Sequence, residues 1–230
     1  MNEARLYDEQ FAKVLPLGWE MSVLLECLRS ASTLLDVGCG TGRHIVPLAE
    51  NGLKVLAIDI SREYVMAAKE KLRSKRLLAD VDLLVADAQH VPVDKVSFDV
   101  AICMGNVLGD VGITNQKRIR IVDEMINAAG CEAIFIIELV HRYWKPKDLL
   151  VWLFRYFRTT LGKLFKKSLE YGDYTETIIV DHRSHRLKFH AFTTREAKLL
   201  FARKGFHVRV EKRGKFFHDW FILVARHKMS

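Results

Sequence analysis

Cysteines are few in this sequence, and long apolar runs are missing. The four cysteines are isolated along the chain, with no C-x-x-C pair and no cluster of cysteine and histidine at metal-ligand spacing. This distribution predicts neither a disulfide framework nor a metal site, and it is typical of reduced thiols. No apolar run approaches the ~18 residues of a membrane-spanning helix, and the N-terminus lacks the basic and apolar regions of a secretion signal. We therefore expect a cytoplasmic protein.

The composition indicates one domain with a substantial core. The chain has 230 residues, of which 50% are hydrophobic, so it can bury a core without disulfides or metal ions. We expect a single domain over residues 1–230, with N-terminal helices within residues 1–30 and an insertion at residues 141–191. The net charge of +8 permits phosphate binding but identifies neither the fold nor the reaction.

Three alternate glycines follow a short apolar segment. Residues 33–37 have the composition of a strand in the middle of a parallel sheet, and Gly38, Gly40 and Gly42 come directly after it. Glycines remove side chains where the chain turns sharply, so a ligand can approach the bare backbone. The residues that follow predict a helix, whose free N–H groups would favour an anionic group here. The spacing is G-x-G-x-G, not the G-x-G-x-x-G of dinucleotide-binding proteins.

Acidic residues end several of the apolar segments. Asp36 lies two residues ahead of the first glycine, and Asp59 and Asp87 end two later segments. Because the carboxyl ends of parallel strands meet at one edge of a sheet, we expect these acids to face one crevice. Asp99 begins its segment, so we expect a structural role for it at the opposite edge. Two structural alternatives stay open, in which Asp36 caps the following turn and Asp59 is the N-cap of the next helix.

On these residues the chain resembles the class I S-adenosylmethionine-dependent methyltransferases, from about Thr33 to the C-terminus. The resemblance implies that the glycine turn wraps the methionine part of S-adenosylmethionine. It also implies that Asp59 binds the ribose hydroxyls and that Asp87, with the Ala88 backbone, meets the adenine. The implied cofactor-binding residues are Asp36, Gly38, Cys39, Gly40, Gly42, Asp59, Ile60, Asp87, Ala88 and Met104.

Helical and strand patterns alternate along the chain. The predicted helices are 9–15, 19–29, 42–51, 62–73, 116–129 and 194–204, and the predicted strands are 33–37, 54–59, 82–86, 98–103, 132–138, 206–212 and 219–226. Such alternation predicts an α/β fold with a Rossmann-like, doubly wound, mostly parallel sheet. In the family that the chain resembles, an antiparallel C-terminal hairpin closes the sheet. That hairpin and the glycine spacing argue against the alternative of a nicotinamide-dependent oxidoreductase.

Residues 141–191 interrupt this core, and we expect a lid over the acceptor. The first part, 142–167, combines large apolar residues with eight bases and a single acid, Asp148. The second part has strand character on both sides of residues 182–184, which predicts a hairpin. Three interpretations of the basic part stay open: a solvated face over a core helix, a helix on an anionic membrane surface, or RNA contact.

The acceptor is expected to be a small molecule. The segment from Met104 to Asp110 is not the Asn-Pro-Pro-aromatic motif of enzymes that methylate amino groups of nucleic acids. No Pro-Cys pair marks a cytosine-methylating nucleophile either. These observations count against base methylation, whereas ribose or sugar-phosphate acceptors and a lipid stay open as alternatives.

Candidate catalytic residues follow the fourth and fifth strands. His141, directly after the fifth strand, is suited to remove a proton from a hydroxyl or an acidic carbon, although a structural role is the alternative. Asn106 and Asp110 are candidates for orienting the acceptor. Glu138 lies inside an apolar run, where we interpret it as an acid paired in the core. A catalytically inactive protein that binds S-adenosylmethionine is the remaining alternative.

Overall fold

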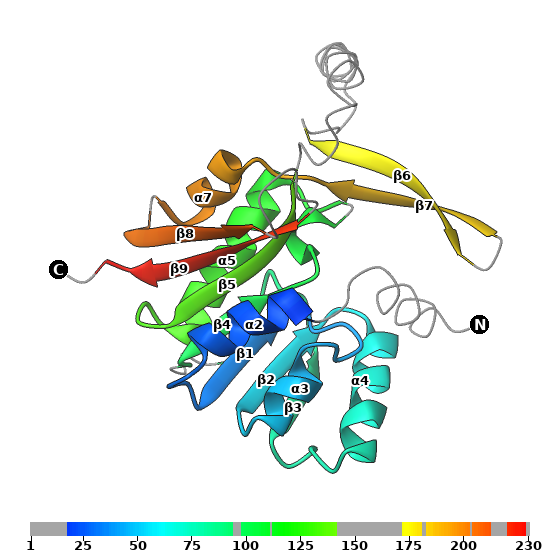
Figure 1. Ribbon diagram of the computed structural model, residues 1–230, viewed down its shortest axis with the longest axis vertical. Helices are drawn as coiled ribbons and strands as arrows, with labels where there is room; N and C mark the ends of the chain where they lie inside the picture. Colours follow the sequence, from blue (N-terminus) through cyan, green and yellow to red (C-terminus); the bar gives the residue numbers. More distant parts are fainter. Residues whose placement is uncertain are drawn as a thin grey trace, which may run out of the picture.

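The computed structural model describes residues 18–93, 98–110, 112–141, 172–180, 183–202, 204–212 and 220–228. Within them, seven strands form one sheet and two form a separate hairpin (Figure 1). The strands are β1 (Thr33–Val37), β2 (Lys54–Asp59), β3 (Val81–Val85), β4 (Val100–Cys103), β5 (Ile134–Val140), β6 (Asp173–Val180), β7 (Arg183–His190), β8 (Phe206–Lys212) and β9 (Trp220–His227). The helices are α2 (Gly18–Cys27), α3 (Ile45–Glu50), α4 (Arg62–Ser74), the short 3-10 helix η1 (Val107–Gly109), α5 (Asn115–Ala129) and α7 (Thr194–Ala202).

The seven-stranded sheet has the order β3-β2-β1-β4-β5-β9-β8. The pairs from β3 to β5 are parallel, and β9 is antiparallel to both of its neighbours. The chain order reverses between β1 and β4, which is the point in an open α/β sheet where ligands bind at the carboxyl ends of the strands. The expected fold class, with its antiparallel closing hairpin, is confirmed.

Helices cover both faces of the sheet, which explains the continuous apolar character of its central strands. Residues of α2, α3 and α4 pack with Leu34 of β1 in one buried cluster. Residues of α5 and α7 pack with Leu35, the next residue of β1, in the other cluster. Successive strand residues point to opposite faces, so each central strand contributes to both clusters.

Two element boundaries differ from the prediction in ways that affect the site. Helix α3 begins at Ile45, three residues beyond Gly42, although the Gly42 carbonyl already accepts a hydrogen bond from Val46 N at 3.2 Å. Strand β5 runs to Val140, two residues further than expected. Glu138 therefore lies within the strand instead of at its end.

The predicted hairpin of the insertion is confirmed, with a tighter turn than expected. Val180 pairs with Arg183, so Arg183 and Ser184 belong to β7 and not to the turn. Figure 1 shows the hairpin extending away from the sheet. Its base joins the core through Phe192 N, which donates to Val140 O at 2.8 Å. The predicted helix 9–15 and the basic segment 142–167 lie outside the described residues.

A buried histidine holds the base of the hairpin. His190 on β7 places Nδ1 2.9 Å from an Asp173 carboxylate oxygen and Nε2 3.0 Å from one of Glu196. Glu196 also accepts from Thr193 N, while its own N–H donates to Thr193 Oγ1, which completes a capping box at the start of α7. The hairpin is thus tied to the core through α7. Among the described helices, none is long and apolar enough to cross a bilayer.

Candidate active site

The glycine turn after β1 is held against the end of β2. Gly38 N and Cys39 N both donate to Ile58 O, and Gly40 N donates to an Asp59 carboxylate oxygen at 2.8 Å. Gly38 has a φ of +84°, and a Cβ there would lie 2.6 Å from a methyl carbon of Val107. Only glycine meets both conditions, because other residues rarely adopt this conformation. The turn therefore brings bare backbone to the switch point of the sheet.

The Asp36 carboxylate is buried without a partner. The residue is 1% exposed, and neither carboxylate oxygen has a hydrogen-bond partner. Burial, and secondarily the nearby Asp59 carboxylate, raise the pKa of Asp36 well above its usual range. Since its oxygens accept nothing, Asp36 does not cap the following turn. The same surroundings raise the pKa of the buried Cys39 thiol, chiefly through burial.

Asp59 links the glycine turn to the start of α4. One carboxylate oxygen accepts from Gly40 N and the other from Ser61 N, both at 2.8 Å. Ser61 is the N-cap of α4, and its hydroxyl oxygen accepts from Tyr64 N. The alternative that Asp59 is the helix N-cap is therefore wrong. Burial raises the pKa of Asp59 despite these hydrogen bonds, and the nearby Asp110 carboxylate raises it further.

The end of β3 and the start of the β2–α4 connection lie beside Asp59. Ala86 N, just beyond β3, donates to Asp59 O at 3.0 Å, which brings the two strand ends together. The Asp87 carboxylate accepts from Gln89 N at 2.8 Å and from the Gln89 side-chain amide, and Ala88 is partly buried. Ile60 is 71% exposed, the highest exposure among the large hydrophobic residues described. An apolar surface therefore lies next to the predicted ribose and adenine residues.

Asn106 follows β4, and its side chain is hydrogen-bonded to the ends of β5 and β7. It has a left-handed backbone, with φ of 60°, and its side-chain oxygen accepts from Val140 N at 3.1 Å. Its side-chain nitrogen donates to His190 O at 3.4 Å. Both ends of the amide are thus used within the protein, whereas Met104, two residues earlier, is buried at the end of β4.

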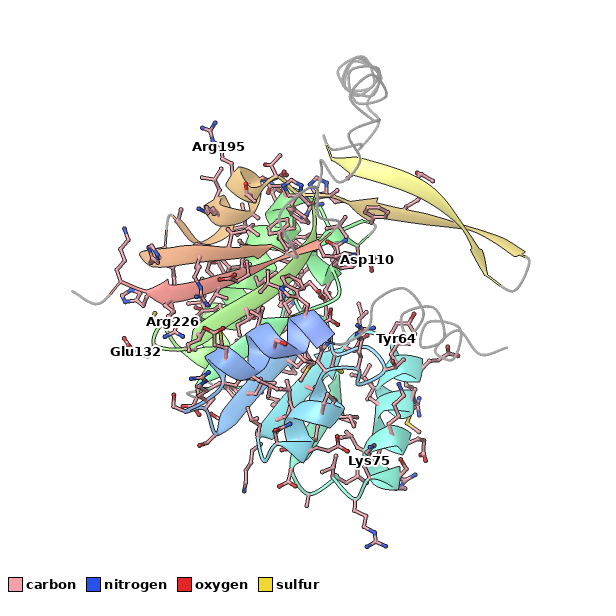
Figure 2. All side chains as sticks on the ribbon, in the orientation of Figure 1. Tyr64, Lys75, Asp110, Glu132, Arg195 and Arg226 are labelled. Atoms are coloured by element: carbon pink, nitrogen blue, oxygen red, sulfur yellow. The ribbon has the colours of Figure 1, made fainter. Side chains whose placement is uncertain are left out.

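His141 and Asp110 lie at the same edge of the sheet. Figure 2 shows Asp110 and Tyr64 toward the edge where the parallel strands end, and Glu132 and Arg226 toward the opposite edge. The His141 ring packs edge-on against Phe221, with ring centroids 5.5 Å apart. Asp110 is exposed and follows η1 directly.

Asp99 has the structural role that its position predicts. One of its carboxylate oxygens accepts from Ser32 N at 2.8 Å, from Thr33 N at 2.9 Å and from the Thr33 hydroxyl at 3.0 Å. These bonds join the start of β4 to the start of β1, away from the glycine turn. They lower the pKa of Asp99, the bond from Ser32 most strongly.

A second buried polar cluster joins α2, the glycine turn and β5. Arg43 donates to the Glu20 carboxylate, with Nε 3.2 Å from the accepting oxygen, and His44 Nε2 lies 3.5 Å from that oxygen. Glu138 is 2% exposed; one of its carboxylate oxygens accepts from Gly105 N at 2.9 Å, and its protonated form shares a hydrogen bond with the Glu20 carboxylate.

The charge states of this cluster differ from residue to residue. Burial alone would raise the pKa of Glu20, but the neighbouring His44 and Arg43 lower it below its usual value. Burial lowers the pKa of His44, so this imidazole is neutral near pH 7. Burial, followed by the Glu20 carboxylate, raises the pKa of Glu138 to about 8. The cluster thus contains an anionic Glu20, a cationic Arg43 and a protonated Glu138.

Sequence reasoning did not assign this cluster to the site. A single acid in an apolar strand was the available signal for Glu138, and a base and a histidine directly after the glycines were the signal for Arg43 and His44. Glu20 gave no signal, because only the fold brings α2 onto the end of β5.

Comparison with known proteins identifies the domain. Residues 34–129 match the family model described as a methyltransferase domain. These residues therefore form a methyltransferase domain. The fold class, the cofactor and the class of enzyme expected from the resemblance are thereby confirmed.

Relatives of this methyltransferase differ in length and function. The chain is 25% identical over 208 residues to an uncharacterized protein of Methanocaldococcus jannaschii, covering 89% of this chain and 71% of that protein. It is 26% identical over 162 residues to a magnesium-protoporphyrin O-methyltransferase of Rhodobacter capsulatus, covering 69% of this chain and 61% of that enzyme. A solved S-adenosylmethionine-dependent methyltransferase from Methanosarcina mazei superposes with a TM-score of 0.70 at 22% identity, covering 90% of this chain and 98% of that one. This last likeness concerns the fold.

Proposed function

We propose that the protein transfers the methyl group of S-adenosylmethionine to a small-molecule acceptor at the carboxyl ends of β1, β4 and β5. The observation that carries this proposal is the Asp36 carboxylate, which is fully buried without a partner beside the bare backbone of the glycine turn. A buried charge of this kind destabilises the folded protein unless a ligand satisfies it. The α-ammonium group of S-adenosylmethionine suits it in charge.

The residues around Asp36 fit the rest of the cofactor. The backbone of Gly38, Cys39, Gly40 and Gly42 would contact the methionine part, and Asp59 retains lone pairs for the ribose hydroxyls after accepting two backbone hydrogen bonds. The exposed Ile60 offers an apolar face for the adenine. Asp87 with Ala88 and Met104 complete the proposed set of cofactor-binding residues.

Positioning is the main task of these residues. Bound S-adenosylmethionine supplies a methyl group on a positively charged sulfur, which is electrophilic without further activation. The protein contributes by aligning the acceptor lone pair and excluding water, and such alignment lowers a barrier by about 7–11 kcal/mol. Asp36, Asp59 and the glycine turn would fix one partner, while the ends of β4 and β5 would fix the other.

Two observations support a small acceptor. A relative that covers 69% of this chain methylates magnesium-protoporphyrin, as its name states. The base of the β6–β7 hairpin is hydrogen-bonded to Asn106 and to the end of β5, where a lid over an acceptor would begin. We propose Asp110 and His141 as the residues that meet the acceptor, with Asn106 positioning the hairpin base.

The test measures cofactor binding and turnover separately. Calorimetry should detect S-adenosylmethionine binding to the wild type, and Asp59→Ala should weaken it about 10- to 100-fold, since hydrogen bonds to charged groups contribute about 1.5–3 kcal/mol. Asp82→Ala, an exposed carboxylate on β3, serves as the matched control and should bind like the wild type. Equal affinity of the Asp59 and Asp82 variants would contradict the assignment.

Turnover decides between an enzyme and an inactive binding protein. The wild type should produce S-adenosylhomocysteine when it is incubated with S-adenosylmethionine and fractionated cell extract. Cofactor binding without any turnover across the fractions would identify a protein that binds S-adenosylmethionine but does not use it.

A further inference from the structure

The imidazole of His190 joins three elements at the base of the β6–β7 hairpin. His190 is the last residue of β7 and is 2% exposed. Its Nδ1 lies 2.9 Å from a carboxylate oxygen of Asp173, the first residue of β6, and its Nε2 lies 3.0 Å from one of Glu196, in the first turn of α7. Figure 1 shows the chain running from β7 directly to α7. Both nitrogens of a buried ring therefore face carboxylates.

This arrangement depends on the number of protons on the ring. A neutral imidazole has one N–H donor and one lone pair, whereas an imidazolium has two donors. Since an ionised carboxylate only accepts, a neutral ring can donate to Asp173 or to Glu196 but not to both. The second contact would then place two lone pairs against each other. An imidazole is a stronger base than a carboxylate, so we assign the second proton to the ring.

Charged groups of both signs surround His190. The two carboxylates bind the ring directly, and a guanidinium lies beyond the neighbouring Phe192 ring, whose centroid is 4.7 Å from that of His190 and 5.3 Å from the guanidinium carbon. The titratable and charged groups on the elements packed here are Asp173 on β6, Glu196 on α7, Arg118 on α5, Asp110 after η1 and His141 after β5. Among the described residues, the hydrogen-bond partners of the ring are both acids.

The base of the hairpin also fits tightly against the loop that follows β4. The His190 carbonyl accepts from the Asn106 side chain at 3.4 Å, and a Cβ at Gly109 would lie 2.5 Å from the same carbonyl oxygen. Arg118 holds the loop from α5, because its Nε donates to Leu108 O at 2.9 Å. Since packed interiors transmit displacements, a shift of β7 at His190 also moves η1.

We propose that His190 is a pH switch that fixes the base of the β6–β7 hairpin. While the ring carries both protons, it binds Asp173 and Glu196 together and holds the hairpin against α7 and η1. When one ring nitrogen gives its proton to water, one of the two contacts breaks and the base of the hairpin loosens. Because Asp110 follows η1, the switch would also act on the acceptor side of the site. This last consequence alone rests on the proposed function.

Hydrogen exchange followed by NMR tests the switch without cofactor or turnover. Ala191 N and Phe192 N are hydrogen-bonded across the base of the hairpin, and Lys54 N, bonded at the opposite edge of the sheet, is the internal reference. The pH is raised from about 5 until the His190 ring signals show that a proton has been lost. The protection factors of the two hairpin amides should fall at least about tenfold with the same midpoint, because a hydrogen bond between charged groups is lost.

Two results of this experiment would overturn the proposal. One is unchanged protection of the hairpin amides after the ring has lost its proton. The other is an equal fall in the protection of Lys54 N, which would show that the whole protein unfolds and that the hairpin does not respond by itself.

Glu196→Gln tests the role of the second proton directly. Glutamine can keep the capping box with Thr193, and its amide can donate to Nε2 of a neutral ring while Nδ1–H still donates to Asp173. This variant should therefore keep its hairpin protection at the pH where the wild type loses it. The matched control Glu211→Gln, which changes a carboxylate paired with Arg209 on β8, should respond like the wild type.

His190→Gln supplies a second check, because its side chain neither gains nor loses a proton in this range. Its hairpin protection should not depend on pH. Loss of protection in Glu196→Gln at the wild-type midpoint, or pH-dependent protection in His190→Gln, would assign the effect to another group and overturn the proposal. Thermal unfolding at about pH 5 establishes beforehand that each variant is folded.

The pH profile of turnover connects the switch to the reaction. With the active extract fraction, wild-type turnover should fall as His190 loses its proton, and Glu196→Gln should lack this fall. Identical profiles of the two proteins would contradict the action of the switch on the acceptor side. Absence of any wild-type turnover would contradict the proposed function, whereas the exchange experiment would still decide on the switch.

Discussion

At the edge where the parallel strands begin, one carboxylate oxygen of Asp99 accepts three hydrogen bonds, whereas at the edge where they end, Asp36 accepts none and Glu138 accepts one. The pKa of Asp99 is lowered by its bonds, and the pKa values of Asp36 and Glu138 are raised by burial. The same type of side chain therefore stabilises the fold at one edge and destabilises it at the other. Such a destabilised group is expected where a ligand binds.

The difference separates stability from function along the same two strands. Asp36 lies near the end of β1, where it pairs with Ile102 of the neighbouring β4, and Asp99 directly precedes the start of β4. At the carboxyl edge, Asp36 and Glu138 are buried, so both of these acids are desolvated. The opposite edge is exposed to solvent, and backbone N–H groups meet its acid directly.

The pH dependence of stability should show the largest effect. Glu138 holds a proton in the folded protein up to about pH 8 but only up to about 4.5 when unfolded. Its contribution to stability is therefore present below the unfolded pKa and is lost as the pH rises through this window, by about 1.4 kcal/mol per pH unit. Urea denaturation at about pH 5 and pH 8 should show the decrease, and Glu138→Gln should reduce it. Asp99 acts in the opposite sense, because its contribution is lost as the pH falls below about 4.

Asp36→Asn should separate affinity from stability. Removing the charge should weaken S-adenosylmethionine binding by about 2–3 kcal/mol, because the proposed charge partner of its ammonium group is lost. At neutral pH the free energy of unfolding should stay equal or rise, since a buried unpartnered carboxylate disappears. Calorimetry and urea denaturation measure the two quantities. A variant that loses stability and keeps its affinity would show that the two edges do not differ as described.

Asp99→Ala should give the converse result. The loss of three hydrogen bonds between β1 and β4 should lower the free energy of unfolding by about 1–2 kcal/mol, the lower part of the range for bonds to a charged group, because the site is exposed. The affinity for S-adenosylmethionine should stay within twofold of the wild type. Weakened cofactor binding by this variant would contradict a purely structural role for the starting edge.

Ser61→Ala should have the smallest effect, because not every residue at the carboxyl edge is expected to contact the cofactor. Ser61 lies at the carboxyl edge, but its hydroxyl caps α4 by accepting from Tyr64 N. Its loss should reduce stability by about 1 kcal/mol, with little change in affinity, because its backbone N–H still donates to Asp59. Ser61→Asp, which keeps a capping oxygen, should retain the stability. A tenfold loss of affinity in Ser61→Ala would show that this hydroxyl contacts the cofactor.

Local patterns predicted the elements well where the signal lies within a few residues. The strands at 33–37, 54–59 and 206–212 were predicted with the bounds that the structure shows. Helix α3 begins later than predicted, because the glycine turn continues through residues 41–44 before a regular helix forms. The predicted turn of the hairpin included residues 183–184, because their residue types do not indicate a strand. In the structure these two residues pair with β6 and belong to β7.

The site was predictable only in its local part. The glycine turn and the acids that end β1, β2 and β3 follow from strand patterns and from the rule that parallel strands end at one edge. Asn106 was expected to orient the acceptor, but its amide is engaged by Val140 and His190, which are distant in the sequence. His141 follows β5 as expected, and its catalytic role stays a prediction.

The sequence by itself determined the parallel sheet, the glycine turn and the acids at its carboxyl edge, because each depends on residues adjacent along the chain. Only the tertiary structure decided which acids are unpartnered. Desolvation and missing partners depend on every segment that packs around a group, and Glu20 of α2, Arg43 of the turn and Glu138 of β5 come together only when the sheet is complete. A carboxylate is the same group in every sequence, and its surroundings in the fold set its charge.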